Sequence, residues 1–309
     1  MSDCFAGIDR GGTIIKAAVF GGGGERLAER QDSTGDGEWE GGVAVWKARV
    51  RELLCGLEAE CGRVAAVGVS SPGLVAGDER SVLSMPGRMD GLEGWEWSGW
   101  LGRGEGVPVV NDAQAALLGE VWCGAARGCR DAVMFTLGTG VGGAIWSGGR
   151  LLRGHLGRAG HFGHLCLDLD GEPTIAGMPG GLENFVGNFS VRERSGGRWE
   201  STRALVAAVA AGDAVARQVW ERSVRALACG VATVINIVDP ERVVIGGGIA
   251  VAGEQLFPLL ERELAAVEWR PAGMAVPVVA AELGEGAGAA GAAWRAAQWI
   301  GACGSGVEA

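Results

Sequence analysis

The apolar residues in the first half of the chain fall into short runs separated by glycine turns. Residues 5–8 and 14–20 predict two strands around the turn 9–13, and residues 64–69 and 107–110 predict two further buried strands. Between residues 43 and 57 the apolar positions recur at helical spacing, which predicts an amphipathic helix. Another helix is expected over residues 113–123, after the strand that ends at residue 110.

The second half of the chain repeats this scheme. Strands are predicted at 132–137 and 144–146, on either side of the glycine turn 138–143, and at 150–152. A long amphipathic helix over about residues 213–238 stops before Pro240. We then expect a strand at 243–245, a glycine turn at 246–248, a helix from about residue 254, a strand at 276–280 and a helix over about 287–299.

The strand–glycine turn–strand unit thus occurs twice, roughly one domain apart. This predicts a duplicated α/β domain with a cleft in which two glycine hairpins hold a polyphosphate from both sides. Such an arrangement suits phosphoryl transfer, where positioning and charge stabilisation do most of the catalysis.

Composition narrows the class of protein. The chain has 309 residues, about two domains' length. The net charge of −10 argues against a nucleic-acid partner, because phosphate backbones are bound by basic surfaces. No apolar stretch reaches the ~20 residues that span a bilayer, and the N-terminus lacks the basic segment of a signal peptide. We therefore expect a cytoplasmic protein without membrane contact.

Cysteine and glycine usage adds two expectations. The eight cysteines are scattered without a C-x-x-C or C-x-x-x-H pair, so we expect buried free thiols rather than disulfides or metal ligands. The 57 glycines follow no collagen-like period and therefore indicate many tight turns and close backbone approaches.

The turn at residues 9–13 is the first candidate phosphate site. Gly11 and Gly12 let the backbone approach a ligand closely, and Thr13 adds a hydroxyl donor. Asp9, at a strand end, would hold Mg²⁺ through water, since this cation prefers carboxylate oxygen and keeps several waters. An ordinary glycine hairpin explains the same residues, so the turn alone leaves both interpretations open.

Two further glycine loops lie in the second half. Residues 138–143 match G-x-G-x-x-G, but a short strand follows where dinucleotide binding requires a helix, so a phosphate-contacting hairpin is the interpretation that remains. The glycines at 246–248 would present flat backbone to an adenine ring or cap the next helix. The residues expected to contact ATP are Gly138, Thr139, Gly140, Gly142, Gly246, Gly247 and Gly248.

Asn111 and Asp112 lie at a strand end, immediately before a helix. Both residue types are favoured as helix N-caps, which is the structural interpretation. The functional one is a carboxylate that accepts a proton from a substrate hydroxyl. Spacing alone does not separate the two.

A set of motifs in the same order, over roughly residues 5–295, resembles the ROK family of bacterial repressors and sugar kinases, which includes glucokinases and N-acetylhexosamine kinases. The motifs are G-I-D-R-G-G-T at 7–13, S-P-G at 71–73, V-V-N-D-A-Q-A-A-L-L-G-E at 109–120, T-L-G-T-G-V-G-G at 136–143, the glycine–histidine run at 159–164, L-E at 182–183 and V-V-I-G-G-G at 243–248.

The resemblance implies the α/β fold of the two-domain actin-like ATPases (ribonuclease H-like), with a central cleft. We expect a small α/β domain over residues 1–111, rejoined by the C-terminal helix at about 286–300, and a large α/β domain over 112–285. ATP phosphates would lie between the loops 9–13 and 138–142, with adenosine near 246–248. Asp112 would be the catalytic base, and the sugar-binding residues implied are Gly73, Asn111, His161, His164 and Glu183.

The chain departs from the family pattern in two places. The family's usual E-x-G-H motif has a glutamate where His161 stands, and an imidazole is not an anionic acceptor. Many members also carry a zinc motif, C-x-C-G-x-x-G-C-x-E. Counting back from its glutamate, the three cysteine positions hold Thr174, Ala176 and Gly181, so we expect no structural zinc.

Together these features predict ATP-dependent phosphorylation of a hexose or N-acetylhexosamine at the 6-hydroxyl, with ATP and Mg²⁺ as cofactors and a homodimeric state. The alternatives are a weak or inactive sugar sensor, suggested by His161, and a polymerising actin-like ATPase. A repressor of the same family would carry an N-terminal helix-turn-helix, and the strand expected from about residue 5 leaves no room for one.

Overall fold

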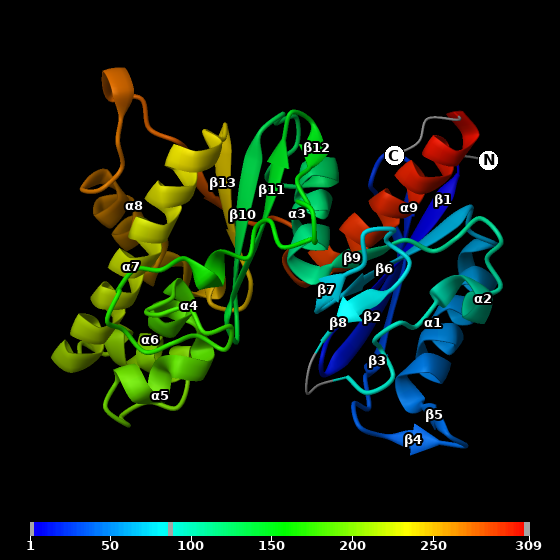
Figure 1. The fold of residues 1–309 in the computed structure, drawn as a ribbon, viewed down its shortest axis with the longest axis horizontal. Coiled ribbons are helices and arrows are strands. Elements are labelled where there is room, and N and C mark those ends of the chain that lie inside the picture. The colour runs from blue at the N-terminus through cyan, green and yellow to red at the C-terminus, as the bar shows by residue number, and fades with distance from the viewer. Residues whose placement is uncertain (1–2, 86–88, 306–309) are drawn as a thin grey trace. The chain divides into compact units, whose positions relative to one another are not determined.

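The computed structural model describes residues 3–85 and 89–305, which form two compact units (Figure 1). The first unit comprises the chain up to Gly128, the segment Arg153–Arg158 and the chain from Glu282 onward. The second comprises Cys129–Leu152 and Ala159–Ala281.

A five-stranded sheet in the order β3-β2-β1-β6-β9 forms the centre of the first unit. Its strands are β1 (Cys4–Arg10), β2 (Ile14–Gly21), β3 (Arg26–Ser33), β6 (Ala66–Ser71) and β9 (Val109–Asn111). β1, β2 and β3 are antiparallel neighbours, whereas β6 runs parallel to β1 and β9 runs parallel to β6. The carboxyl ends of β1, β6 and β9 therefore meet at one edge of the sheet.

Three helices cover this sheet. The helix α1 (Val45–Cys61) packs on β2 and β3, while α9 (Ala287–Ser305) packs on β1 and β6 and α3 (Asp112–Cys123) packs against α9. Shorter elements of the unit are β4 (Trp39–Glu40), β5 (Val43–Ala44), β7 (Leu74–Val75), β8 (Val82–Ser84), α2 (Trp97–Leu101) and a 3₁₀ helix at Gly284–Gly286.

The first unit extends past the predicted boundary at residue 111, because glycines bring α3 and α9 into backbone contact. A Cβ on Gly291 of α9 would lie 1.7 Å from the carbonyl oxygen of Ala115, and one on Gly119 of α3 would lie 2.6 Å from that of Ala287. The segment Arg153–Arg158 also belongs here, since Arg153 donates to the Ala76 carbonyl at 2.9 Å.

The second unit has a sheet of the same design, in the order β12-β11-β10-β13-β14. Its strands are β10 (Ala132–Leu137), β11 (Val141–Ser147), β12 (Arg150–Leu151), β13 (Arg242–Gly246) and β14 (Val278–Ala280). Again three strands are antiparallel neighbours and the remaining two are parallel. The repeated strand–glycine turn–strand pattern of the sequence thus corresponds to two sheets with one topology.

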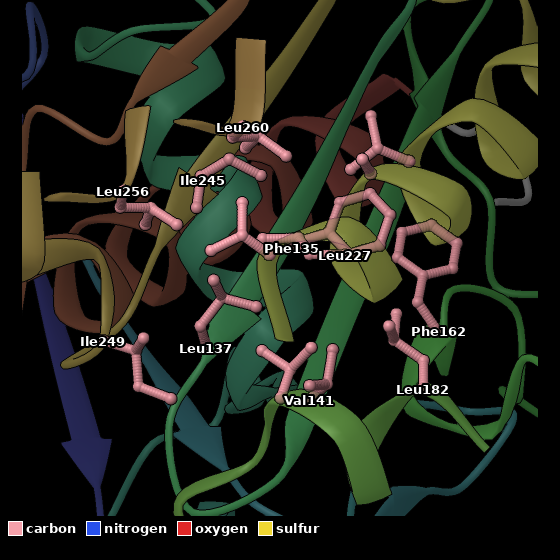
Figure 2. Packing of buried hydrophobic residues seen from close by; sticks show 14 of the residues in the cluster. Phe135, Leu137, Val141, Phe162, Leu182, Leu227, Ile245, Ile249, Leu256 and Leu260 are labelled. Atoms are coloured by element: carbon pink, nitrogen blue, oxygen red, sulfur yellow. The ribbon is translucent and has the colours of Figure 1, made fainter. Parts of the chain in front are cut away.

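Helices on the second sheet build a single apolar core. Phe135 and Leu137 of β10, Leu227 of α7 and Ile245 of β13 lie close together in it (Figure 2). The helices are α4 (Leu182–Val186), α5 (Val191–Arg194), α6 (Thr202–Ala210), α7 (Ala214–Val238) and α8 (Phe257–Ala265), with 3₁₀ helices at Phe162–His164, Asn188–Ser190, Ala250–Gln255 and Pro271–Gly273. No helix of the described chain is both long and apolar enough to cross a bilayer.

The cysteines differ in part from expectation. All those with described side chains are free thiols, as predicted, but none of these is fully buried: Cys55 and Cys166 are exposed, and the others are partly exposed. The side chain of Cys303 lies outside the described residues.

Candidate functional site

The turn between β1 and β2 is fixed by hydrogen bonds from a buried threonine, Thr34. Thr34 donates its hydroxyl to the Gly11 carbonyl at 2.7 Å and its backbone N–H to the Thr13 carbonyl at 2.8 Å. The N–H of Gly11 closes the turn on the Ile14 carbonyl at 3.0 Å, and a Cβ at Gly11 would lie 2.9 Å from that oxygen. Gly12 and Thr13 form the accessible tip. The backbone of this turn is therefore fixed, as a phosphate loop requires.

Asp9 is the last residue but one of β1 and lies beside this turn. Its Oδ1 accepts a hydrogen bond from the Ser70 hydroxyl at 2.7 Å, and its carboxylate lies against Gly288, where a Cβ would be 2.6 Å from the carboxyl carbon. Burial raises the pKa of Asp9 from 3.8 to about 6, the Ser70 bond opposes the rise, Asp112 adds to it and Lys16 opposes it. The nearby hydrogen bond and positive charge therefore do not fully compensate the Asp9 carboxylate for its burial.

Asn111 and Asp112 take different roles at the start of α3. The Asn111 Oδ1 accepts from the backbone N–H groups of Ala113 and Gln114 at 3.1 and 3.4 Å, which makes Asn111 the N-cap. Its Nδ2 donates to the Gly73 carbonyl at 3.1 Å, so these two predicted sugar residues are joined. Asp112 is the first helical residue and is exposed.

The loop after β10 is the counterpart in the second unit. The Gly138 N–H bonds the Gly140 carbonyl at 3.0 Å, and the carbonyls of Gly138 and Thr139 accept from the N–H groups of Asn188 and Phe189, each at 3.0 Å. The glycines lead into the strand β11, which includes Gly142, and not into a helix. The hairpin interpretation of this motif therefore agrees with the fold.

The glycines after β13 lie at the end of the strand adjacent to β10. Gly247 has φ +85°, and a Cβ there would meet the Leu137 carbonyl oxygen at 2.4 Å, so only glycine fits. Gly246 is packed against Met134, whereas Gly248 faces open space. Gly248 thus presents bare backbone, which suits contact with a flat ring.

Glu183 and His164 form a polar pair in the second unit. The His164 Nδ1 lies 3.6 Å from the Glu183 Oε1, and among the described residues neither buried atom has a hydrogen-bond partner. The other oxygen, Oε2, lies 2.8 Å from where a Cβ of Gly140 would be, so Glu183 packs against the loop after β10. The buried Leu182, beside Glu183, anchors the start of α4 in the core (Figure 2).

His161 is exposed at the start of the 3₁₀ helix, and its ring lies nearly parallel to that of His164 with centroids 6.4 Å apart. Phe162 holds this turn, because its ring packs in the core at 4.5 Å from Phe135 (Figure 2).

A hydroxyl organises the loop where family members carry zinc ligands. The Thr174 Oγ1 accepts from the backbone N–H groups of Ala176 and Met178, each at 3.3 Å, and the Thr174 N–H donates to the Met178 carbonyl at 2.8 Å. A Cβ on Gly181 would collide with the Thr174 methyl at 2.2 Å. In the described part of the chain, no three histidine, cysteine or acidic side chains gather as a metal site.

Sequence reasoning missed several residues that shape these loops. Thr34 follows an exposed strand and gave no signal, and Asn188 and Phe189 contact the second loop only through backbone atoms. Ser70 stands one position before the S-P-G motif, where its contact with Asp9 depends on the pairing of β1 with β6. Lys16 could have been singled out by its rarity, because the chain contains only one other lysine.

Comparison with known proteins agrees with these features. The sequence matches the ROK family over residues 5–298. It is 35% identical to the glucokinase of Thermotoga maritima, with 93% of this chain and 95% of that protein aligned. It is also 35% identical to the bifunctional enzyme NanE/NanK of Brucella melitensis over 94% of this chain, which spans about half, 54%, of that longer protein.

A solved structure shares the fold. The ROK family glucokinase of Streptomyces griseus, determined in complex with glucose and AMPPNP, superposes with a TM-score of 0.76 at 29% identity, covering 96% of this chain and 99% of that one. The predicted actin-like ATPase fold is thereby confirmed. The chain belongs to the ROK family.

Proposed function

We propose that the protein phosphorylates a hexose or an N-acetylhexosamine at the 6-hydroxyl, with ATP as phosphoryl donor. Support comes from the glucokinase relative in Thermotoga maritima and from the Streptomyces griseus structure, whose ligands are glucose and an ATP analogue. Further support comes from side chains of this protein that suit proton abstraction, sugar and phosphate binding, and Mg²⁺ binding.

The observation that carries the proposal is the division of roles at the start of α3. Asn111 is the N-cap, and the Asp112 Oδ1 also accepts a hydrogen bond from the Ala113 N–H, at 2.8 Å. The Asp112 carboxylate is exposed on the first helical turn, where it would accept the proton of a sugar hydroxyl. The hydroxyl oxygen then forms a bond to the γ-phosphorus, the bond to the β–γ bridging oxygen breaks, and ADP leaves.

Binding groups are present in each unit. In the first, the Gly73–Asn111 pair holds the segment before Asp112 in place, and the backbone of residues 11–13 would bind phosphate. In the second, the unpartnered Nδ1 of His164 and Oε1 of Glu183 would bind sugar hydroxyls, since a buried polar atom without a partner is costly.

The surroundings of Asp9 fit a magnesium ion. Its pKa is raised by burial and by Asp112, so a cation beside it would relieve an unneutralised carboxylate. Oxygen ligands from one or two carboxylates plus phosphate are the usual set for Mg²⁺. When bound, the ion would neutralise charge on the transferring phosphoryl group.

The test is ADP release over a panel of aldohexoses and N-acetylhexosamines, with the phosphorylated carbon assigned by NMR. Asp112→Asn should lower kcat by at least ~10²-fold while sugar affinity is retained, because a general base is lost. Asp213→Asn is the matched control. It makes the same change at the N-cap of α7, where asparagine caps equally well, and turnover should stay unchanged.

Two outcomes would contradict the proposal. Near-normal turnover of the folded Asp112→Asn variant would remove Asp112 as the base. Sugar binding by the wild type without phosphorylation of any sugar would instead support a sensor.

A further inference from the structure

A cavity of about 660 Å³ lies within the second unit, between α4, α5, the first half of α7 and the loop at residues 168–173. Cavities of roughly 300–1,000 Å³ hold small organic ligands. Among the described residues, none of those assigned above to the sugar, the phosphates or Mg²⁺ lines it. Glu183 of α4 packs against the loop after β10, whereas the next two residues, Asn184 and Phe185, line the cavity.

Two arginine side chains line this cavity, and neither forms an ion pair with any described residue. Arg194 of α5 donates to the Gly187 carbonyl and to the Ser190 hydroxyl, each at 2.6 Å, and its buried Nε has no partner in the described chain. Burial lowers the pKa of Arg194 from 12.5 to about 10. Arg222 of α7 is exposed, with its guanidinium 5.9 Å from the ring centroid of Phe185. The cavity therefore offers two positive charges to a bound anion.

The remaining side chains suit a body that carries hydroxyl groups. Phe185 and Phe189 supply aromatic surface, and 53% of Phe189 is exposed. The exposed carboxylates of Asp168, Glu172 and Glu193 also line the cavity. An ionised carboxylate accepts hydrogen bonds from hydroxyls and repels a second anionic group. This combination favours a ligand with one anionic group and several hydroxyls.

We propose that the cavity binds a sugar phosphate as an effector, at a site beyond the proposed catalytic one. The phosphate group lies on Arg194 and Arg222, because the planar guanidinium binds phosphate oxygens through paired hydrogen bonds. The sugar ring packs against Phe185 and Phe189. The N–H of Phe189 donates to the Thr139 carbonyl at 3.0 Å, so a ligand here is linked to the loop after β10 by one backbone hydrogen bond.

The experiment titrates glucose 6-phosphate into the protein by calorimetry, with excess AMPPNP and the sugar substrate present to occupy the proposed active site. The wild type should bind one equivalent per chain. Arg222→Gln should weaken this binding roughly ten- to hundredfold, the scale of a lost charged hydrogen bond. Inorganic phosphate should bind more weakly than glucose 6-phosphate.

Two further measurements locate the ligand and its effect. Hydrogen exchange should show that glucose 6-phosphate protects α5 and residues 215–223 of α7. At a concentration that saturates the wild type alone, it should change the turnover of the wild type and leave that of Arg222→Gln unchanged.

Arg217→Gln is the matched control. It makes the same change at another exposed arginine of α7, which does not line the cavity, so affinity for glucose 6-phosphate should stay as in the wild type. Arg194 is left intact, because its bond to the Gly187 carbonyl also supports the fold. Melting temperatures show whether each variant remains folded.

Several results would overturn the proposal. They are protection confined to other segments, equal affinity in the wild type and folded Arg222→Gln, and inorganic phosphate binding as tightly as glucose 6-phosphate. Binding without any change in turnover would remove the effector role. If the wild type phosphorylates no sugar, the proposed function fails, whereas protection of α5 and α7 and its loss in Arg222→Gln still decide whether the cavity is a sugar-phosphate site.

Discussion

The ionised Asp9 carboxylate should destabilise the metal-free protein. Replacing Asp9 with a residue that cannot ionise should therefore stabilise the fold. The pKa of this carboxyl is raised to about 6 in the folded state, first by burial, against an ordinary value of 3.8. Between these two values the native state binds more protons than the unfolded state, so stability falls as pH rises from about 4 to 6. Above about pH 6 the native state carries the full free-energy cost of an ionised, buried Asp9. Below about pH 4 the carboxyl is protonated in both states and this cost disappears.

The raised pKa sets the magnitude. The difference between 3.8 and about 6 corresponds to up to about 3 kcal/mol at neutral pH. Asp9→Asn keeps the shape of the side chain and an acceptor for the Ser70 hydroxyl but cannot ionise. We expect the variant to exceed the wild type in free energy of unfolding by up to about 3 kcal/mol at pH 7.5, and to match it near pH 4.

Urea unfolding followed by tryptophan fluorescence, with EDTA present, measures this difference at both pH values. Asp131→Asn is a control of opposite sign. Hydrogen bonds from the Ser147 hydroxyl and then the Gly148 N–H lower the pKa of Asp131, so that variant should lose stability at pH 7.5 and less at pH 4. A difference between Asp9→Asn and wild type that is zero, negative or independent of pH would refute the reasoning. Adding Mg²⁺ should stabilise the wild type and not Asp9→Asn.

Three further outcomes are expected. Gly140→Ala should displace the Glu183 carboxylate and raise the sugar KM with little change in melting temperature, whereas Gly248→Ala, which has open space, should leave the sugar KM unchanged. His161→Ala should raise the sugar KM several-fold if the exposed imidazole bonds the sugar, a loss of roughly 0.5–1.5 kcal/mol, and an unchanged KM in steady-state assays would exclude that contact. Elemental analysis should find no stoichiometric zinc, and chelators should not shift melting, because the Thr174 hydroxyl already organises the loop; one tightly bound zinc per chain would contradict this.

Local pattern determined the elements whose signals lie within a few residues of one another. The strands on either side of the two glycine turns and the helix after Asn111 agree with the structure, but both turns are shorter than predicted, because β1 extends to Arg10 and β11 begins at Val141. Each is a short, nearly continuous run of buried residues or a helix whose apolar residues lie within one element, so the sequence alone identifies them. The family motifs are equally local, and they predicted the actin-like fold.

Other features depended on neighbours distant in sequence. The strand β3 buries only Ala28 and shows no apolar periodicity, so it forms because it pairs with the edge of β2. The first unit runs beyond residue 111 because α3 packs against α9, which follows more than one hundred residues later.

The candidate site divides in the same way. Residue type and position at strand ends identified Asp9, Asn111 and Asp112 as candidate site residues from the sequence. Only the folded chain shows that Asn111 takes the cap and that Lys16 lies opposite Asp9. Capping depends on where one side-chain oxygen points, and the pairing depends on strand register, in which a shift by one residue would turn Lys16 to the other face. Both are decided by backbone geometry that the whole sheet imposes.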